Sequence, residues 1–262
     1  MVDTSRRAVM ITGASSGIGA TYADRFAERG HGLVLVARDN ARLESIAGLL
    51  QRENGIRVDI LPADLTDPSQ LAAVENRLRG DDRIGILVNN AGAAIMGAFA
   101  TADMDALERL IRLNVTSVVR LAGAVVPRFV AEGDGAIINL SSVLALAPEA
   151  FGGIYPATKS FVLTFSLALQ TELAAKGVYV QAVLPASTRT EIWQRSGMDI
   201  DAISGVMPVD ELVDAALAGF DRKELVTIPP LPDEQQWSDF EAARLAMRPN
   251  FRQEHPAARY RT

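Results

Sequence analysis

Residues 8–19 read Ala8-Val-Met-Ile-Thr12-Gly13-Ala-Ser-Ser-Gly17-Ile-Gly19, an apolar run that is followed at once by a glycine-rich turn. A short apolar run of this kind is typical of a buried strand, and helical periodicity begins at Gly17. Glycines at such a junction allow a tight turn and let the backbone approach a pyrophosphate, whose charge the helix N-terminus stabilises. The glycines alone could form a plain tight turn, but their position between a strand and a helix favours a site that binds a dinucleotide.

The alternation of strand and helix continues along the chain. Further apolar runs lie at 33–37, 57–63, 84–88, 136–140, 178–184 and 224–228. Segments with helical periodicity lie at about 17–29, 40–53, 68–79, 102–131, 155–176 and 208–220. Nearly continuous apolar strands that alternate with helices indicate a parallel sheet covered on both faces. We therefore expect an α/β fold of three layers, doubly wound, with a seven-stranded, mainly parallel sheet.

The chain shows no linker, internal repeat or low-complexity tract, and its 262 residues suit one large α/β domain. We expect a single dinucleotide-binding domain over residues 1–262. Within it we expect a substrate-loop region at about 186–207 and a C-terminal extension at about 231–262.

The composition excludes several classes of function. The sequence has no Cys and two His, so we expect no metal site, and cysteine nucleophiles are excluded. A net charge of −6 disfavours nucleic-acid binding. The apolar run after Arg7 is too short for a secretion signal, and no uninterrupted apolar run reaches the ~18 residues of a membrane span. We expect a soluble, cytoplasmic protein.

The glycine loop also fits a second motif. Residues 13–17 read Gly-x-Ser-x-Gly, as in the nucleophile elbow of serine hydrolases, with Ser15 as the nucleophile. That interpretation needs an oxyanion hole from an earlier strand–loop, whereas only one strand precedes this loop, and it needs His255 as the base. A Ser15 hydrolase is therefore a disfavoured alternative.

The second expected strand ends at Ala37, and Arg38 and Asp39 follow it. In dinucleotide-binding folds this position faces the adenosine ribose, where an acidic residue binds a free 2′-hydroxyl and an arginine binds a 2′-phosphate. Asp39 is expected to cap the next helix. Unless Arg38 is simply a solvated loop charge, it favours NADP(H), with NAD(H) as the alternative cofactor.

Four polar residues that could take part in a reaction lie at strand ends or on helices. Tyr155 and Lys159 are four residues apart, so they share a helix face, and the ammonium is expected to lower the pKa of the phenol. Ser142 ends the fifth strand, where ligands of open α/β sheets bind. Asn114 interrupts an apolar helix, where it can free a backbone carbonyl and hold a water.

Two more strand ends carry polar residues or glycine. Asp64 and Leu65 follow the third strand, where a carboxylate can accept a hydrogen bond from an adenine amino group. Residues 89–92, Asn-Asn-Ala-Gly, follow the fourth strand, where amides can tie strands together and Gly92 lets a ligand come close. Each of these residues alone could also cap a loop or be a satisfied buried polar group.

Together these residues resemble the short-chain dehydrogenase/reductase family, from about Ala8 to Thr190. The motifs that carry the resemblance occur in the family's order: 12–19, Asp64, 89–92, Asn114, Ser142, Tyr155 and Lys159. Tyr155 follows Ser142 by 155 − 142 = 13 residues, the interval usual in the family. The resemblance implies a Rossmann fold and an NADP(H)-dependent oxidoreductase that interconverts a ketone or aldehyde and an alcohol.

The resemblance also assigns roles to single residues. Tyr155 would be the general acid/base, Lys159 would lower its pKa and bind the nicotinamide ribose, Ser142 would polarise the carbonyl, and Asn114 would position a water. Cofactor contacts are expected from Gly13, Ser15, Ser16, Gly17, Ile18, Gly19, Arg38, Asp64, Leu65, Asn90, Ala91, Gly92, Tyr155, Lys159, Pro185, Thr188 and Thr190. Two positions depart from the family pattern, because Ala186 follows Pro185 and Ala145 follows the serine pair where glycine is more usual.

The expected substrate wall comes from 143–153 and 191–207 and is mostly apolar. It contains Leu144, Leu146, Phe151, Ile192, Trp193, Met198 and Met207. These residues favour an apolar small-molecule carbonyl or alcohol. The resemblance further implies a homodimer or homotetramer. The alternative from another class is a cofactor-binding sensor or scaffold without catalysis, against which the intact Asn114, Ser142, Tyr155 and Lys159 set argues.

Overall fold

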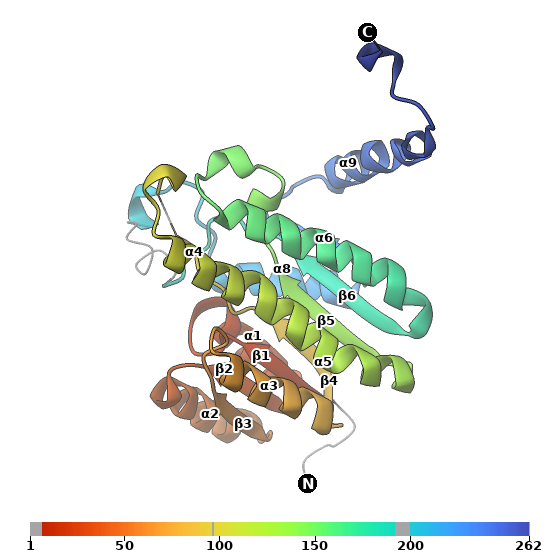
Figure 1. Cartoon of the computed structure of the whole chain (residues 1–262). Helices are drawn as coiled ribbons and strands as arrows, with labels where there is room; N and C mark the ends of the chain where they lie inside the picture. Colours follow the sequence, from red (N-terminus) through yellow and green to blue (C-terminus); the bar gives the residue numbers. More distant parts are fainter. Residues whose placement is uncertain (1–6, 96, 192–199, 262) are drawn as a thin grey trace. The chain divides into compact units, whose positions relative to one another are not determined.

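Seven short strands form one sheet in the computed structural model of the chain (Figure 1). They are β1 Ala8–Thr12, β2 Leu33–Ala37, β3 Val58–Pro62, β4 Ile84–Asn89, β5 Gly135–Leu140, β6 Val178–Val183 and β7 Val226–Thr227. The strand order is β3-β2-β1-β4-β5-β6-β7, and all six pairings are parallel. The order reverses between β1 and β4, which opens a crevice at the carboxyl ends of these strands. The predicted doubly wound fold is confirmed.

The structure describes residues 7–95, 97–191 and 200–261. They divide into two units, Met1–Pro229 and Pro230–Thr262. In the second unit, helix α9 (Glu234–Ala246) is capped by Asp233, whose carboxylate accepts from the Gln235 backbone N–H at 2.9 Å. This helix was not predicted, because its apolar residues are interspersed with charges and show little helical periodicity. The predicted single-domain organisation stays a prediction.

Helices cover both faces of the sheet in the first unit. They are α1 Gly17–Glu28, α2 Asn40–Asn54, α3 Pro68–Gly80, α4 Met104–Ile111, α5 Ser117–Glu132, α6 Tyr155–Leu173 and α8 Val209–Asp221. The core on one face takes side chains from α1, α2 and α8, and the core on the other takes them from α3, α5 and α6. Burial of these apolar side chains on both faces explains why the strands read as continuous apolar runs.

Short helical turns complete the connections. The 3₁₀ turns of the first unit are Phe99–Thr101, Val143–Ala145, Pro148–Ala150, Ala174–Lys176 and Ile200–Ala202, and those of the second are Arg248–Arg252 and Ala258–Tyr260. Asp39 caps α2, because its Oδ1 accepts from the Arg42 backbone N–H at 3.1 Å, as predicted.

Two predicted elements differ from the structure. The single helix expected over 102–131 is divided into α4 and α5 by a π-helical turn at Arg112–Thr116, where the Ser117 N–H donates to the Arg112 carbonyl. The strand expected over 224–228 shrinks to two residues, because Glu224 N–H donates to Gly219 O at 2.9 Å and closes the end of α8.

The stretch Met104–Glu132, made of α4, the π-helical turn and α5, is long and apolar enough to cross a membrane if length and composition alone are considered. Core helices of soluble domains pass the same test. Here Leu121, Val125 and Phe129 of α5 pack into the core that α3, α5 and α6 share with the sheet. We therefore interpret the stretch as a core element of this fold.

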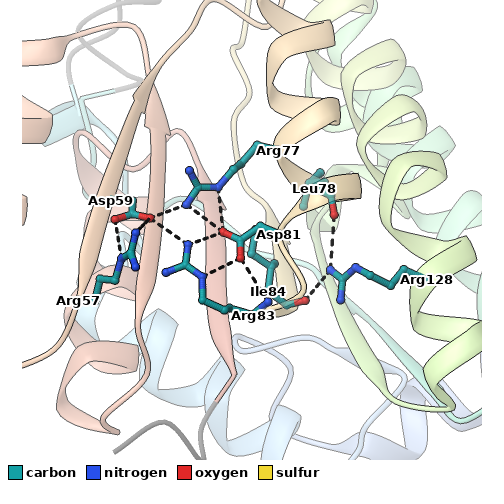
Figure 2. A network of polar contacts seen from close by, with 8 residues as sticks. All are labelled: Arg57, Asp59, Arg77, Leu78, Asp81, Arg83, Ile84 and Arg128. Atoms are coloured by element: carbon teal, nitrogen blue, oxygen red, sulfur yellow. Dashed lines mark hydrogen bonds and ion pairs between the residues drawn. The ribbon is translucent and has the colours of Figure 1, made fainter. Parts of the chain in front are cut away.

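A network of charged side chains ties the amino ends of β3 and β4 to the end of α3 (Figure 2). Asp59 accepts from Arg57 at 2.9 Å, from Arg83 at 3.2 Å and from Arg77. Asp81 accepts from Arg77 at 2.9 Å and from Arg83 at 2.6 Å. Partial burial disfavours the charged form of Asp59, but the hydrogen bonds from the three arginines outweigh it and lower the pKa of Asp59 to about 2.

This pKa predicts how the Asp59 carboxylate contributes to stability. The folded pKa lies below the usual ~3.9 of an unfolded Asp, so the contribution is present above pH ~4 and is lost as the pH falls towards 2. We expect Asp59→Asn to lower the melting temperature at pH 7, and we expect this difference to shrink progressively below pH ~4. Thermal unfolding by circular dichroism measures both. Asp134→Asn, at a carboxylate that is 71% exposed, is the control. If Asp59→Asn lowered the melting temperature equally at pH 7 and at pH 2.5, the contribution of the Asp59 carboxylate to stability would be contradicted.

Candidate active site

The glycine loop lies directly against the end of β4. The Thr12 hydroxyl accepts from the Asn90 and Ala91 backbone N–H groups, each at 3.0 Å, and the Asn90 amide donates to the Thr12 carbonyl at 2.8 Å. A Cβ on Gly19 would stand 2.3 Å from the Gly13 carbonyl oxygen and 2.5 Å from Asn90 Nδ2. The loop and the β4 end therefore fit only when position 19 is glycine.

The start of α1 offers donors to an anion. Ser16 is the N-cap residue with φ −168°, and within the described chain its hydroxyl makes no capping hydrogen bond. The first-turn N–H groups of a helix have no intrahelical acceptor, so they and the helix dipole favour a phosphate. Ser15 and Ile18 flank this turn. Gly17, with φ +52°, lies against Thr190, because a Cβ added to Gly17 would stand 3.1 Å from Thr190 Cγ2. This donor set fits the pyrophosphate of a dinucleotide.

The end of β2 carries a positive charge. The Arg38 side chain is 72% exposed, and its Nη1 lies 3.9 Å from Asp64 Oδ2. Asp64 Oδ1 accepts from the Thr66 N–H at 2.9 Å and from the Thr66 hydroxyl at 2.8 Å, so Asp64 also caps its own loop. Leu65 is buried beside it. An exposed guanidinium at this position fits a 2′-phosphate better than a free 2′-hydroxyl.

Ser142, Tyr155 and Lys159 come together at the carboxyl ends of β5 and β6. Tyr155 and Lys159 lie on the first two turns of α6, where the Lys159 Nζ is 5.7 Å from the centre of the Tyr155 ring. A hydrogen bond joins Tyr155 to Ser142. The Ser142 hydroxyl also donates to the Pro185 carbonyl at 3.3 Å, while the Leu144 N–H donates to Ser142 Oγ at 3.2 Å. Three predicted residues thus form one cluster.

The pKa of Tyr155 departs from the predicted direction. Burial of the phenol raises it to about 12, and the hydrogen bond with Ser142 opposes this rise. Burial also lowers the pKa of Lys159 to about 8, and its ammonium donates to the Leu140 carbonyl at 2.8 Å. The expected lowering of the Tyr155 pKa by the Lys159 charge is therefore not the dominant effect on this phenol. A phenol with this pKa keeps its proton at neutral pH, as an ordinary tyrosine does, and burial makes it a weaker acid.

Asn114 lies at the π-helical turn and faces the loop after β4. Its Oδ1 accepts from the Ala93 N–H at 3.0 Å, and its Nδ2 donates to the Ala93 carbonyl at 2.9 Å. A Cβ on Gly92 would lie 3.3 Å from Asn114 Oδ1 and 3.5 Å from Lys159 Nζ. Gly92 therefore lies close to both Asn114 and Lys159, so the loop after β4 lies beside the Tyr155–Lys159 pair of α6.

The substrate side is built from the loops after β5 and β6. The Phe151 ring lies 5.4 Å from the Tyr155 ring, and a Cβ on Gly153 would approach the Gly97 carbonyl to 3.5 Å. Thr188, which is 4% exposed, forms a β-bridge with Met207. Leu144 and Leu146 follow Ser142 at the turn Val143–Ala145. Of the predicted wall, Ile192, Trp193 and Met198 lie outside the described residues.

Two contacts were missed from the sequence. Thr158 accepts from Asn114, and Arg42 of α2 pairs with Glu191, whose carboxylate oxygens both lie 2.8 Å from Arg42 Nη1. The second contact joins the ribose side of the crevice to the chain that follows Thr190. Threonine and arginine are common on helices, so their presence does not indicate these contacts. The paired residues are 44 and 149 positions apart, so no local pattern could have revealed the pairs.

The Ser15 alternative needs a histidine beside the glycine loop. His31 lies beyond the far end of α1, about 18 Å away for a 12-residue helix, and its Nδ1 is 2.7 Å from the Arg7 carbonyl oxygen. The other histidine, His255, is in the second unit. Within the described residues of the first unit, Ser15 therefore has no histidine base.

Comparisons with known proteins show which family the chain resembles. A family model described as short chain dehydrogenase matches residues 7–201. A short-chain dehydrogenase from Sphingobium yanoikuyae in complex with NADPH is 58% identical, with a TM-score of 0.96 over 97% of this chain and 100% of that one. A bulky-bulky ketone specific alcohol dehydrogenase from Comamonas testosteroni is 51% identical, with a TM-score of 0.91 over 98% of this chain and 99% of that one.

A human protein, 17-beta-hydroxysteroid dehydrogenase type 3, is 38% identical over 69% of this chain. The alignment covers 59% of the human protein. The chain thus spans about three fifths of the length of the curated relatives it matches.

The close approach at Gly19 predicts a selective defect. We expect Gly19→Ala to force the glycine loop and Asn90 apart, because the added methyl group would overlap the Gly13 carbonyl. NADPH affinity, measured by fluorescence titration, should fall at least ~10-fold, since the loop positions the phosphate donors. Gly48→Ala on α2 is the matched control, because the new Cβ meets only the movable Arg52 guanidinium at 3.3 Å. Wild-type affinity in Gly19→Ala would show that the loop does not hold the nucleotide.

Proposed function

The chain belongs to the short-chain dehydrogenase family, and we propose that it is an NADP(H)-dependent oxidoreductase that interconverts a bulky, apolar ketone and its secondary alcohol. The observation that carries the proposal is the cluster of Ser142, Tyr155 and Lys159 beside a crevice whose glycine loop fits a dinucleotide. The high similarity to an NADPH complex, over 97% of this chain and 100% of that one, supports the choice of cofactor.

The residues that would hold the cofactor follow the crevice from one end to the other. Arg38 would bind the 2′-phosphate, residues 15–19 the pyrophosphate, and Lys159 the nicotinamide ribose. Bound NADPH supplies the hydride for the carbonyl carbon. The role of the protein is to orient the cofactor and the substrate and to provide a proton.

Proton transfer is assigned to Tyr155. In reduction, its O–H bond breaks and the proton goes to the carbonyl oxygen as that oxygen gains charge, which leaves a phenolate. The Ser142 hydroxyl, hydrogen-bonded to Tyr155, orients the same oxygen. The buried Lys159 ammonium stabilises the phenolate through its charge. In alcohol oxidation these roles reverse, and the phenolate accepts the hydroxyl proton.

The substrate class is proposed from the apolar wall and the relatives. Phe151 adjoins Tyr155, Leu144 and Leu146 follow Ser142, and glycines at 97, 152 and 153 place no side chains beside them. A relative that is 51% identical along almost the whole chain is specific for ketones with bulky groups on both sides. We assign this chain the same class.

Location and assembly complete the proposal. The family resemblance and the partly exposed apolar side chains Ile111, Val119 and Phe161 on α4, α5 and α6 support a homodimer or homotetramer. We place the protein in the cytoplasm, with no nucleic-acid partner. Sedimentation equilibrium and cell fractionation test these two statements, and a monomer or a membrane-bound pool would contradict them.

The proton-transfer role predicts the effect of removing one oxygen atom. We expect Tyr155→Phe to lower kcat for reduction of butyrophenone or benzophenone by at least ~100-fold, because general acid catalysis contributes factors of this size. NADPH affinity should change little. Tyr179→Phe, which removes a hydroxyl that donates to the Glu224 carbonyl away from the site, is the control. Unchanged turnover in Tyr155→Phe would refute the role, and NADPH binding without turnover in the wild type would favour a sensor or scaffold.

The charge at the end of β2 predicts cofactor preference. We expect Arg38→Asp to weaken NADPH binding and to shift the preference towards NADH by at least ~10-fold, because a carboxylate repels a 2′-phosphate and accepts from a 2′-hydroxyl. The ratio of the two dissociation constants, measured by fluorescence titration, is the readout. Arg52→Gln, which removes an exposed charge in the last turn of α2, serves as the control for a nearby charge. An unaltered ratio in Arg38→Asp would show that Arg38 does not read the phosphate.

A further inference from the structure

Thr158 lies between the two residues of the Tyr155–Lys159 pair on α6 and is 3% exposed. Its hydroxyl makes two hydrogen bonds. It donates to the Tyr155 carbonyl at 2.7 Å, and it accepts from Asn114 Nδ2 at 3.1 Å. A buried side chain in this position touches the backbone of the proton donor directly.

The direction of these hydrogen bonds is fixed. The Tyr155 carbonyl can only accept, so the single hydroxyl proton of Thr158 points at it, and a lone pair of the hydroxyl faces Asn114. Asn114 therefore turns its N–H₂ group towards Thr158 and its Oδ1 towards the Ala93 N–H at 3.0 Å. A continuous chain of hydrogen bonds runs from the loop after β4, through Asn114 and Thr158, to Tyr155.

This series of hydrogen bonds joins the loop after β4 to the start of α6. Ala93 follows Gly92, which faces Lys159, and Tyr155 begins α6 on the other side. Asn114 is held at the π-helical turn, so it cannot follow α6 if that helix shifts. Other bonds, from Lys159 to Leu140 and from Ser141 to Lys159, tie α6 to the end of β5, while the Thr158 hydroxyl ties its first turn to Asn114 and the loop after β4.

We propose that Thr158 is a positioning residue for proton transfer, which sets the place of the Tyr155 phenol by coupling α6 to Asn114 and the β4 loop. The inference rests on the proposed function, since proton transfer must occur for its geometry to matter. Displacements of about 1 Å in such a site can lower the rate up to ~100-fold. We expect loss of the hydroxyl to lower kcat more than it raises KM, because Thr158 is not part of the substrate wall.

The same helix offers a matched control. Thr171 donates to the Leu167 carbonyl at 3.0 Å, which is the ordinary bond of a helical threonine to the preceding turn, and Thr171 is exposed. Thr158 and Thr171 therefore both bond to the preceding helical turn, and Thr158 also accepts a hydrogen bond from Asn114. A role that consists only of helix stabilisation predicts similar effects at both positions.

The experiment compares Thr158→Val, Thr158→Ser and Thr171→Val in the full chain with NADPH and butyrophenone. Valine keeps the shape and removes the hydroxyl, and serine restores it. We expect Thr158→Val to lower kcat by at least ~10-fold with KM and NADPH affinity within ~2-fold of the wild type. Thr158→Ser should recover kcat to within ~3-fold, and Thr171→Val should match the wild type. Thr158→Val should add little to the defect of Asn114→Ala, because the two residues act through one chain.

The outcomes separate this inference from the proposed function. Equal kcat values in Thr158→Val and the wild type, or a defect that Thr158→Ser does not recover, overturn the positioning role and leave the proposed function standing. Full additivity with Asn114→Ala also overturns it. A wild-type chain that binds NADPH and reduces no ketone in the series from acetophenone to benzophenone overturns both. If Thr158→Val fails to fold, Thr158→Ala replaces it in the same comparison.

Discussion

The hydrogen bonds between Thr12 and the end of β4 are the constraint on which the crevice depends. The Thr12 hydroxyl donates to the Val88 carbonyl at 3.2 Å and accepts from the Asn90 and Ala91 N–H groups. These bonds hold the glycine loop and the β4 loop together where the strand order reverses. Together with the pairing of β1 and β4 and the Asn90 side-chain bond to the Thr12 carbonyl, they set the separation between the helix N-terminus and Gly92, so that a dinucleotide can contact both.

From this junction the chemistry extends along the sheet edge. Gly92 adjoins Asn114 and Lys159, and α6 brings Tyr155 to Ser142 at the end of β5. Burial acts on the two ionisable groups in opposite ways, since it keeps the phenol protonated and makes the ammonium easier to deprotonate. The site therefore depends on placing a neutral acid and a desolvated cation side by side, which a surface arrangement would not do.

The sequence predicts the sheet well because a strand buried on both faces is mostly apolar, as β2, Leu-Val-Leu-Val-Ala, shows directly. It also indicates Ser142, Tyr155 and Lys159, because strand ends and helical spacing determine which edge they reach. The sequence marked Asn114 as an interruption but did not predict the π-helical turn at Arg112–Thr116, in which Asn114 contacts Ala93 and Thr158, residues distant along the chain. The raised pKa of Tyr155 was missed for the same reason, because burial is a property of the fold and not of spacing.

The central claim is that a hydride and a proton meet at a ketone held beside Tyr155. The most direct measurement is product analysis after incubation of the protein with butyrophenone and NADPH that carries deuterium at both C4 positions. The account predicts an alcohol with one deuterium on the carbinol carbon, as read by mass spectrometry. An alcohol without deuterium, or no alcohol at all from a chain that binds NADPH, would contradict it.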